Sequence, residues 1–265
     1  MRVLQGVIAV VGTIALAVAI VAAGFLVCLL PPVTHGLAGA FSDSDVSPFE
    51  KDQLVQVADA TRDYAFGNHD LKQLYLTIYE VDRVYADGLA AEGKAPGTDF
   101  PGTLTSPANA SVKDFARINA GASDRYCYTP EVITHLDDCN NIVHFAYPFI
   151  AVCAIAAVAA LVWGAHRRGA HRVGLMLRVG GIAVLAAFVA LGVWALVDFN
   201  GFFTAFHGLF FSQGGWTFAY DSLLICALPT AFWMGMGFIW LLVSVVLSVL
   251  AILVGGRLMH GRRRR

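Results

Sequence analysis

The stretch DFNGFFTAFHGLFFSQGGWTFAYDSLLICALPTAFW, residues Asp198–Trp233, decides the fold of this chain. It is rich in aromatic residues, but Gly201, the pair Gly214-Gly215 and Pro229 interrupt it. A membrane-spanning helix needs about 20 consecutive apolar residues, and neither half of this stretch supplies them. We therefore expect helices that lie at a membrane surface, or dip into it, without crossing it.

The whole composition is that of a small integral membrane protein, because 57% of the 265 residues are hydrophobic and only 14% are charged. Four other segments are apolar for long enough to span a bilayer. The sequence thus predicts an all-α membrane protein with four transmembrane helices, a mainly helical extracellular domain between the first two, and an aromatic interfacial segment between the last two. The predicted spans are residues 1–30, 143–164, 173–198 and 235–256, with the extracellular domain at 31–142, a cytoplasmic loop at 165–172, the interfacial or re-entrant segment at 199–234 and a basic tail at 257–265.

The distribution of charge predicts the orientation. Ten of the 18 Lys and Arg residues lie on the same side of the four spans as the chain termini. Because cytoplasmic loops carry the excess of basic residues, we expect a multi-pass protein of a bacterial plasma membrane with both termini in the cytoplasm. Residues 31–142 carry eight basic residues against 17 acidic ones, a net charge of −9. So acidic an outer face argues against nucleic acid as a partner.

Two of the five cysteines fall in the predicted extracellular domain. Cys127 and Cys139 are twelve residues apart, a spacing that suits a disulfide in an oxidising compartment. The other three lie in or next to apolar stretches and are interpreted as packing residues.

His207 is the single basic residue of the opening stretch, and on a helix it shares a face with Phe203, Phe210 and Phe211. An imidazole held among phenylalanines at a lipid–water boundary is partly desolvated. Desolvation keeps the ring neutral and able to exchange a proton.

A second histidine is predicted at the same level. Thr129 and Pro130 are suited to open a helix that runs into the second span. This helix places Glu131, Asp137 and Asp138 beside His135, and a neighbouring carboxylate raises the basicity of an imidazole. A histidine pair of this kind suits general acid–base catalysis. Two alternatives stay open, namely two separate interfacial histidines and, with less support from the spacing, a metal site of His135, Asp138 and His207.

No protein nucleophile is evident, because the chain has no GxSxG elbow and Ser212 is a weak candidate. We expect any attacking group to belong to the substrate. Two non-enzymatic functions are also compatible with a four-span membrane protein. A membrane scaffold or accessory protein remains the alternative function, whereas a carrier is disfavoured because the four spans contain almost no charge.

Two motifs carry a resemblance to a known family. Residues 131–138, EVITHLDD, and residues 203–211, FTAFHGLFF, followed by Trp216, Phe218, Asp221 and PTAFW, resemble the lipoprotein intramolecular transacylase (Lit) family and related four-span membrane proteins. Arg62-Asp63-Tyr64 and Gly67 resemble the family's first external helix more weakly. The chain departs from the pattern at Cys139, where an aliphatic residue is expected, and in an inserted region, Gly93–Asn109.

The resemblance implies a reaction in which one acyl chain moves from a lipoprotein's diacylglyceryl group to the amino group of its N-terminal cysteine. It maps the two motif histidines onto His135 and His207, with His135 assigned as base and His207 as proton donor on the extracellular face. The supporting residues are Glu131, Asp137, Asp138, Trp216 and Asp221, and the acyl groove is Phe203, Phe206, Phe210 and Phe211. The partners implied are lipid and lipoprotein, with no cofactor and no metal.

Overall fold

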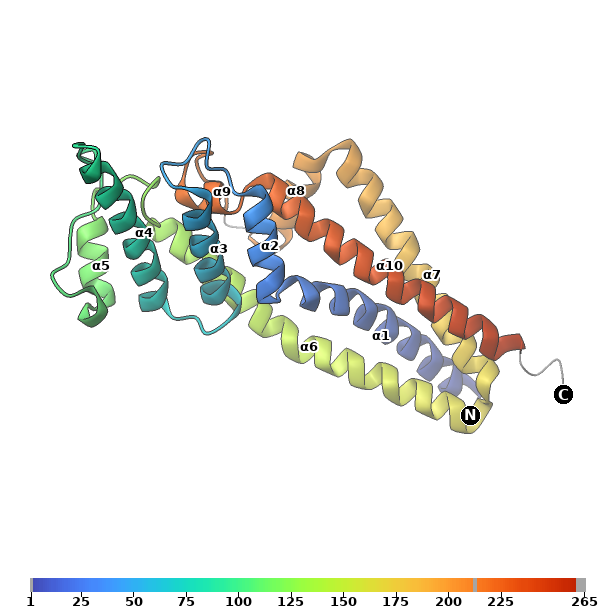
Figure 1. Cartoon of the computed structure of the whole chain (residues 1–265). Coiled ribbons are helices and arrows are strands. Elements are labelled where there is room, and N and C mark those ends of the chain that lie inside the picture. The colour runs from blue at the N-terminus through green and yellow to red at the C-terminus, as the bar shows by residue number, and fades with distance from the viewer. Residues whose placement is uncertain (1, 212–213, 261–265) are drawn as a thin grey trace. The chain divides into compact units, whose positions relative to one another are not determined.

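The computed structural model describes residues 2–211 and 214–260, and within them the regular secondary structure is helical throughout (Figure 1). This confirms the predicted all-α class. The elements are α1 (Arg2–Cys28), α2 (Pro31–Phe41), α3 (Lys51–Phe66), α4 (Leu71–Ala91), the short 3₁₀ helix η1 (Pro107–Asn109), α5 (Val112–Asn119), α6 (Pro130–Arg168), α7 (Ala170–Val197), α8 (Phe199–Phe210), α9 (Leu223–Ala227) and α10 (Thr230–His260).

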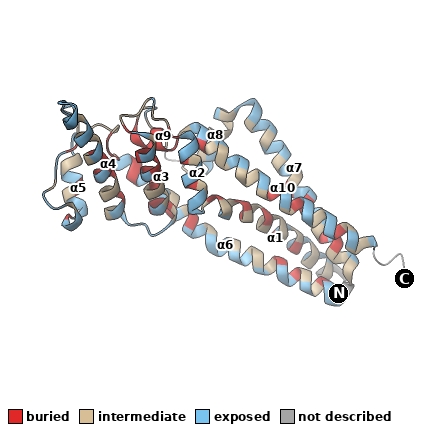
Figure 2. Cartoon of the chain, viewed as in Figure 1, coloured by how far each residue is buried: buried red, intermediate tan, exposed pale blue. Residues whose placement is uncertain are grey.

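Four helices are long and apolar enough to cross a membrane, as the sequence predicts. They contain the candidate spans Gln5–Cys28, Pro130–His166, Ala170–Val197 and Thr230–His260. Much of their surface is exposed, which Figure 2 shows as the pale blue of α6 and α7. Only helices and closed barrels satisfy their backbone hydrogen bonds inside lipid, so exposed apolar helices of this length are explained by a surrounding bilayer.

The chain forms two compact units. The first contains Met1–Cys28, His144–Leu209 and Gly237–Arg265, and the second contains Leu29–Val143 and Phe210–Met236. In the first unit small residues let the helices approach closely. A Cβ atom on Gly24 of α1 would come within 2.6 Å of the Trp240 ring of α10, and the Trp240 indole N–H donates to the Val21 carbonyl over 2.8 Å.

The break between α7 and α8 has a local cause at Asp198. Its carboxylate oxygen Oδ1 accepts the backbone N–H of Gly201 at 2.8 Å, and its carbonyl accepts that of Phe202 at 3.0 Å. Asp198 therefore ends α7 and caps α8. At 12 residues, α8 extends about 18 Å, which is too short to cross a bilayer. The expectation of a non-spanning helix in the aromatic stretch is confirmed.

The second unit is built from two segments that are far apart in sequence. The hydroxyl of Ser42 donates to the Ala227 carbonyl at 2.9 Å, and the Leu223 N–H donates to the Asp124 carbonyl at 2.8 Å. Its core is dense. Fully buried side chains include Phe49, Leu54, Leu74, Ile78, Leu223 and Phe232, from α3, α4, α9, α10 and the loop before α3.

Several details were not predicted. The sequence predicts that the first span ends at residue 30, and the structure shows that Pro31-Pro32 begins a further helix, α2, because proline suits the first turn of a helix. The helix α5 was missed as well. After α8 the chain turns through Gly214 and Gly215, whose φ angles of 78° and 79° are left-handed. Such angles favour glycine, which has no Cβ atom to collide with the backbone.

Candidate functional site

His135 lies on the first part of α6, which belongs to the second unit. The helix begins at Pro130, as predicted, and the buried side chains Val132, Ile133 and Leu136 anchor it in the core of the unit. His135 itself is half-buried. The core therefore fixes the backbone that carries this imidazole and leaves the ring partly accessible.

The surroundings of the His135 ring are aromatic. Its centroid lies 4.7 Å from that of Phe211 and 5.6 Å from that of Phe218, both in the segment that follows α8. Its Nε2 atom lies 3.7 Å from the Sγ atom of Cys139, one helical turn further along α6. The structure thus brings residues of the two predicted motifs, EVITHLDD and the aromatic stretch, into contact around one histidine.

The three predicted carboxylates have other surroundings. Asp137 accepts a short hydrogen bond from the Tyr64 hydroxyl and lies 3.4 Å from His69 Nε2. Glu131 is exposed, and a hydrogen bond with the Thr129 side chain is the main reason that its carboxylate is stabilised. Asp138 is also exposed. Because residues two apart on a helix do not face each other, Asp137 is better placed to hold α6 against α3 than to orient His135.

The sequence reasoning missed the cluster of Tyr64, His69 and Asp137. The His69 ring stacks on Tyr64 with centroids 4.3 Å apart, and its Nδ1 donates to the Tyr64 carbonyl at 3.0 Å. Both ring nitrogens therefore face acceptors, an arrangement that an imidazolium satisfies fully. Burial, followed by the Asp137 bond, raises the pKa of Tyr64 above its usual value, so the phenol remains a donor. The weak resemblance at Arg62-Asp63-Tyr64 was the one available signal.

His207 lies on α8 and belongs to the first unit. Its Nδ1 atom lies 2.8 Å from the Phe203 carbonyl oxygen, and its ring centroid lies 4.0 Å from that of Phe203. Since a carbonyl can only accept, Nδ1 carries the proton and Nε2 is the acceptor nitrogen of the neutral ring. Burial lowers the pKa of His207 below its usual 6.5, although the carbonyl bond opposes that shift. The predicted neutral, aromatic environment of His207 is therefore present.

The four residues of the predicted acyl groove differ in their contacts and in their exposure. Phe203 stacks near Phe199 at 5.8 Å, and Phe206 packs against the His207 ring at 5.7 Å. Phe206 and Phe210 are exposed, while Phe203 and Phe211 are half-buried. Exposed phenylalanines are costly in water and suit a surface that meets lipid. Among the other supporting residues, Trp216 is half-buried.

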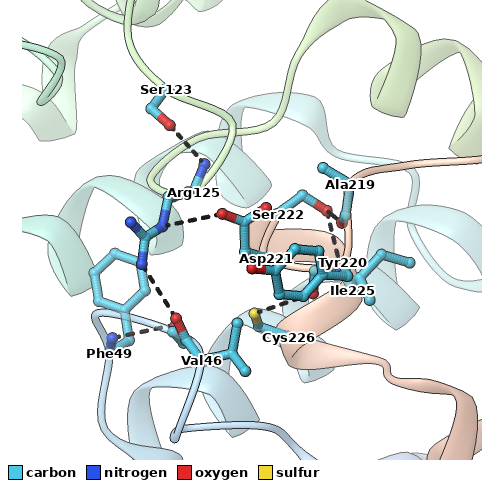
Figure 3. A network of polar contacts seen from close by, with 11 residues as sticks. Val46, Phe49, Ser123, Arg125, Ala219, Tyr220, Asp221, Ser222, Ile225 and Cys226 are labelled. Atoms are coloured by element: carbon cyan, nitrogen blue, oxygen red, sulfur yellow. Dashed lines mark hydrogen bonds and ion pairs between the residues drawn. The ribbon is translucent and has the colours of Figure 1, made fainter.

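Asp221 ties the aromatic segment to the rest of the second unit (Figure 3). Its Oδ2 atom lies 3.7 Å from the Nε atom of Arg125, whose terminal nitrogen donates to the Val46 carbonyl at 3.2 Å. Arg125 therefore bridges the loop before α3 and the loop before α9. This supports a structural role for Asp221 rather than a role in proton transfer.

The predicted disulfide is not formed, because Cys127 and Cys139 are both free thiols. Cys127 is buried, and its thiol donates to the Ser123 carbonyl at 3.5 Å. Burial is the main cause that raises the pKa of Cys127 to about 12. Cys139 faces His135 instead. A spacing of twelve residues made the pairing possible, but the two side chains have different partners.

Two cavities lie in the second unit, and neither is lined by His135. One of about 320 Å³ separates α3 from α4 and has a polar, acidic lining that includes Asp63, Tyr64 and Asp70. The other, of about 500 Å³, lies where α2 meets α3. Both volumes fall in the range of small-ligand sites.

The fold and both motifs agree with comparisons to known proteins. Residues 118–233 match the family model described as lipoprotein intramolecular transacylase Lit. This segment of the chain is similar to the Lit family. This segment holds His135, His207 and the aromatic stretch, so the motifs that carry the resemblance lie inside the match. A search of curated proteins found no match.

Solved structures of Lit have a fold similar to that of this chain. The membrane-integral lipoprotein intramolecular transacylase Lit from Bacillus cereus has a TM-score of 0.64 and 16% identity, with 100% of both chains covered. Its histidine-to-arginine variant is 18% identical over 98% of this chain and 94% of that one, with a TM-score of 0.62. Its histidine-to-alanine variant is 17% identical over 99% and 96%, also with a TM-score of 0.62. The Lit fold of this chain is therefore maintained at low identity.

Proposed function

We propose that this chain is a membrane acyltransferase that moves one acyl chain from the diacylglyceryl group of a lipoprotein to the amino group of its N-terminal cysteine. The observation that carries the proposal is the position of His135. It is a half-buried imidazole, it is fixed by a packed helix, and Phe211 and Phe218 from the second motif contact it. A ring in such a setting is suited to contact a lipid-linked ester and to exchange a proton.

The substrate explains why no protein nucleophile is needed. The ester and the amine belong to one molecule, so the amine reaches the carbonyl carbon at a high effective concentration. The amine nitrogen forms the new amide bond, the ester C–O bond breaks, and the glycerol oxygen leaves. The enzyme has only to remove a proton from nitrogen, stabilise the negative charge that develops on the carbonyl oxygen, and deliver a proton to the glycerol oxygen.

We propose His207 as the general base and His135 as the hydrogen-bond donor, which reverses the division suggested by sequence. The support comes from the His207 tautomer, since the Phe203 carbonyl holds the proton on Nδ1 and leaves Nε2 as the acceptor. Its lowered pKa keeps the ring neutral, which a base requires. Once protonated by the amine, the same nitrogen can return the proton to the glycerol oxygen.

The groove assignment remains part of the proposal. Phe203, Phe206, Phe210 and Phe211 would bind acyl chains, because exposed aromatic side chains gain little by contact with water and much by contact with hydrocarbon. Trp216 would contact the same lipid at the polar boundary, where indole rings are favoured.

We also propose the orientation and the segment boundaries given by sequence. The basic loop at 165–172, the tail at 257–265 and both termini would be cytoplasmic, with residues 31–142 and 199–234 outside. Single cysteines introduced into these segments of a cysteine-free chain would be labelled by an impermeant maleimide in intact cells only if they are outside. If residues in 165–172 are labelled and residues in 31–142 are not, the orientation of the protein is the opposite of the one proposed.

Mass spectrometry of lipoprotein N-termini tests the function. Cells that express the chain should contain lipoproteins with an N-acylated cysteine and a lyso-glyceryl group, and cells that lack it should contain the diacylglyceryl form. The His207→Ala chain, expressed to the same level, should leave the diacylglyceryl form unchanged. Identical N-termini in all three cultures would reject the acyltransferase and favour a scaffold.

The cooperation of the two histidines is tested by the double variant. If both act in one reaction, the His135→Ala/His207→Ala chain should lose no more activity than the worse single variant, because groups that act as a unit are not additive. If the two losses of activity add fully in the double variant, the two histidines do not act together in one step.

A further inference from the structure

The cavity of about 500 Å³ in the second unit begins close in sequence to the end of a candidate membrane span. It is lined by Pro31, Pro32, His35, Gly36, Asp59, Arg62 and Asp63. Pro31 is only three residues beyond Cys28, where a candidate span ends. Since consecutive Cα atoms are 3.8 Å apart, the cavity wall begins within about 11 Å of the end of that span. This is the depth of phospholipid headgroups. We call this cavity the α2–α3 groove.

One guanidinium, that of Arg62, lines the groove. The Arg62 side chain is only 15% exposed, and it contacts the carboxylate of its neighbour Asp63. Its Nε atom is buried and has no hydrogen-bond partner within the described residues. A guanidinium carries five N–H donors, so Arg62 can donate to the oxygens of a ligand in the groove as well as to Asp63.

Two carboxylates also line the groove. Asp59 pairs through Oδ2 with His35 Nδ1 at 2.8 Å, but in the part of the chain that the structure describes its Oδ1 atom is buried without a partner. Asp63, whose side chain is 52% exposed, is a second carboxylate on the same wall. A ligand that fits here must bring a hydrogen-bond donor as well as an anion, and a primary ammonium group supplies three N–H donors.

The start of α2 determines where the anion is favoured. This helix has 11 residues, and Pro31 and Pro32 at its start line the groove, so the positive end of the helix borders it. A helix N-terminus attracts negative charge, and an arginine matches phosphate oxygens with two parallel hydrogen bonds. Phosphate at Arg62 and ammonium at Asp59 and Asp63 would leave neither charge unpaired.

We propose that the α2–α3 groove binds the headgroup of a phospholipid that carries a primary amine. The phosphate contacts Arg62, and the ammonium donates to Asp59 and Asp63. A headgroup with glycerol in place of the amine lacks the positive charge, and a choline headgroup lacks the N–H donors. Neither His135 nor His207 lines this groove, so the site is independent of the acyl transfer proposed above.

Native mass spectrometry of the full chain in detergent tests the proposal. The purified protein is titrated with phosphatidylethanolamine, phosphatidylcholine and phosphatidylglycerol of identical acyl chains. We expect about tenfold tighter retention of phosphatidylethanolamine, since one hydrogen bond to a charged group is worth about 1.5 kcal/mol or more. Arg62→Gln and Asp59→Asn should each remove this preference. Equal retention of the three lipids by the wild-type chain would overturn the proposal.

Arg83→Gln is the matched control. Arg83 lies in the same unit and also has a buried Nε atom without a partner among the described residues, but its guanidinium lies over the rings of Tyr79 and Phe100 and does not line the groove. The control should keep the lipid preference. If Arg62→Gln unfolds, as judged by circular dichroism, Arg62→Lys replaces it and should retain binding with a weaker preference.

A soluble headgroup separates a lipid from a free phosphate compound. Glycerophosphoethanolamine has the same charges without acyl chains, and it should compete only at much higher concentration, because the neighbouring bilayer lipids hold the headgroup at the groove. Binding of this compound as tight as that of the lipid would overturn the lipid assignment. Loss of lipid preference with unchanged acyl transfer in Arg62→Gln would support a separate site.

Discussion

The two parts of α6 have opposite surroundings although they form one helix. Val132 and Leu136, in the second unit, are 3% and 5% exposed. Phe145 and Ile155, in the first unit, are 81% and 69% exposed. Apolar residues of equal hydropathy are thus buried by protein in one part, and in the other they are left for lipid to cover.

This difference shows that burial has a different energetic meaning in each unit. In the second unit, removal of apolar surface from water stabilises the fold. In the first, lipid chains are as apolar as leucine, so close packing of small residues and interhelical hydrogen bonds contribute instead. The same substitution should have different consequences on the two sides, which the following experiments measure.

The largest effect is expected at a histidine of the buried part. His135→Ala should reduce acyl transfer by a factor of about 10² to 10³, which is the range for loss of one hydrogen-bond donor to the developing oxyanion. His144→Ala changes an exposed histidine on the same helix and should leave the rate unchanged. The rate is measured by single-turnover conversion of a diacylglyceryl lipopeptide, with circular dichroism as the control for folding. A fully active His135→Ala chain would exclude the residue from the chemistry.

The second experiment compares two phenylalanines. Phe49 is 1% exposed and packs edge-on against Tyr85 and Tyr126. Phe49→Ala should lower the free energy of unfolding by about 3–5 kcal/mol, because it leaves a cavity in the core. Phe145→Ala should change it by less than about 1 kcal/mol, since lipid or detergent fills the space. Denaturant titration in detergent measures both, and equal losses would contradict the contrast between the units.

The third experiment uses a buried carboxyl in the second unit. Asp82 is 1% exposed, and burial raises its pKa to about 8 from 3.8, with Arg83 opposing the shift. In the unfolded chain the group ionises near pH 3.8, whereas in the folded chain it stays protonated. The free energy of unfolding should therefore fall as pH rises from about 4 to about 8, by at least about 1 kcal/mol. Asp82→Asn should remove that slope, and a slope that persists would assign it to another group.

The smallest expected change is in the titration of His207. Nitrogen NMR of histidine-labelled chain should give a pKa below 6.5 with the proton of the neutral ring on Nδ1, because burial disfavours the charged form. Phe203→Ala keeps the backbone carbonyl but exposes the ring, and it should raise the pKa towards 6.5. A neutral ring that carries its proton on Nε2 would remove His207 as the proposed base.

The spans, the interfacial aromatic helix and the start of α6 were predictable because each depends on local sequence. Runs of apolar residues identify spans, and Pro130 marks a helix start. The pair Pro31-Pro32 shows the limit of the same reasoning, since proline ends one helix and begins the next. A sequence pattern does not say which of these two roles a given proline has.

The candidate site was predicted in its residues but not in their partners. Asp137 was assigned to His135 because it is near in sequence, whereas its contacts are Tyr64 and His69, about 70 residues away. No local sequence pattern singles out His69. Contacts between distant segments depend on tertiary packing, which one sequence without relatives does not reveal.

The turn at Gly214 and Gly215 has a consequence for the choice of amino acid. Two consecutive left-handed residues have the backbone handedness that a mirror-image amino acid prefers. A semisynthetic chain with D-alanine at position 215 should fold as readily as the natural one, while L-alanine there should be disfavoured by about 1–2 kcal/mol. Glycine is the one achiral residue that the ribosome supplies, so it is the one encoded residue that adopts both left-handed conformations without a steric penalty.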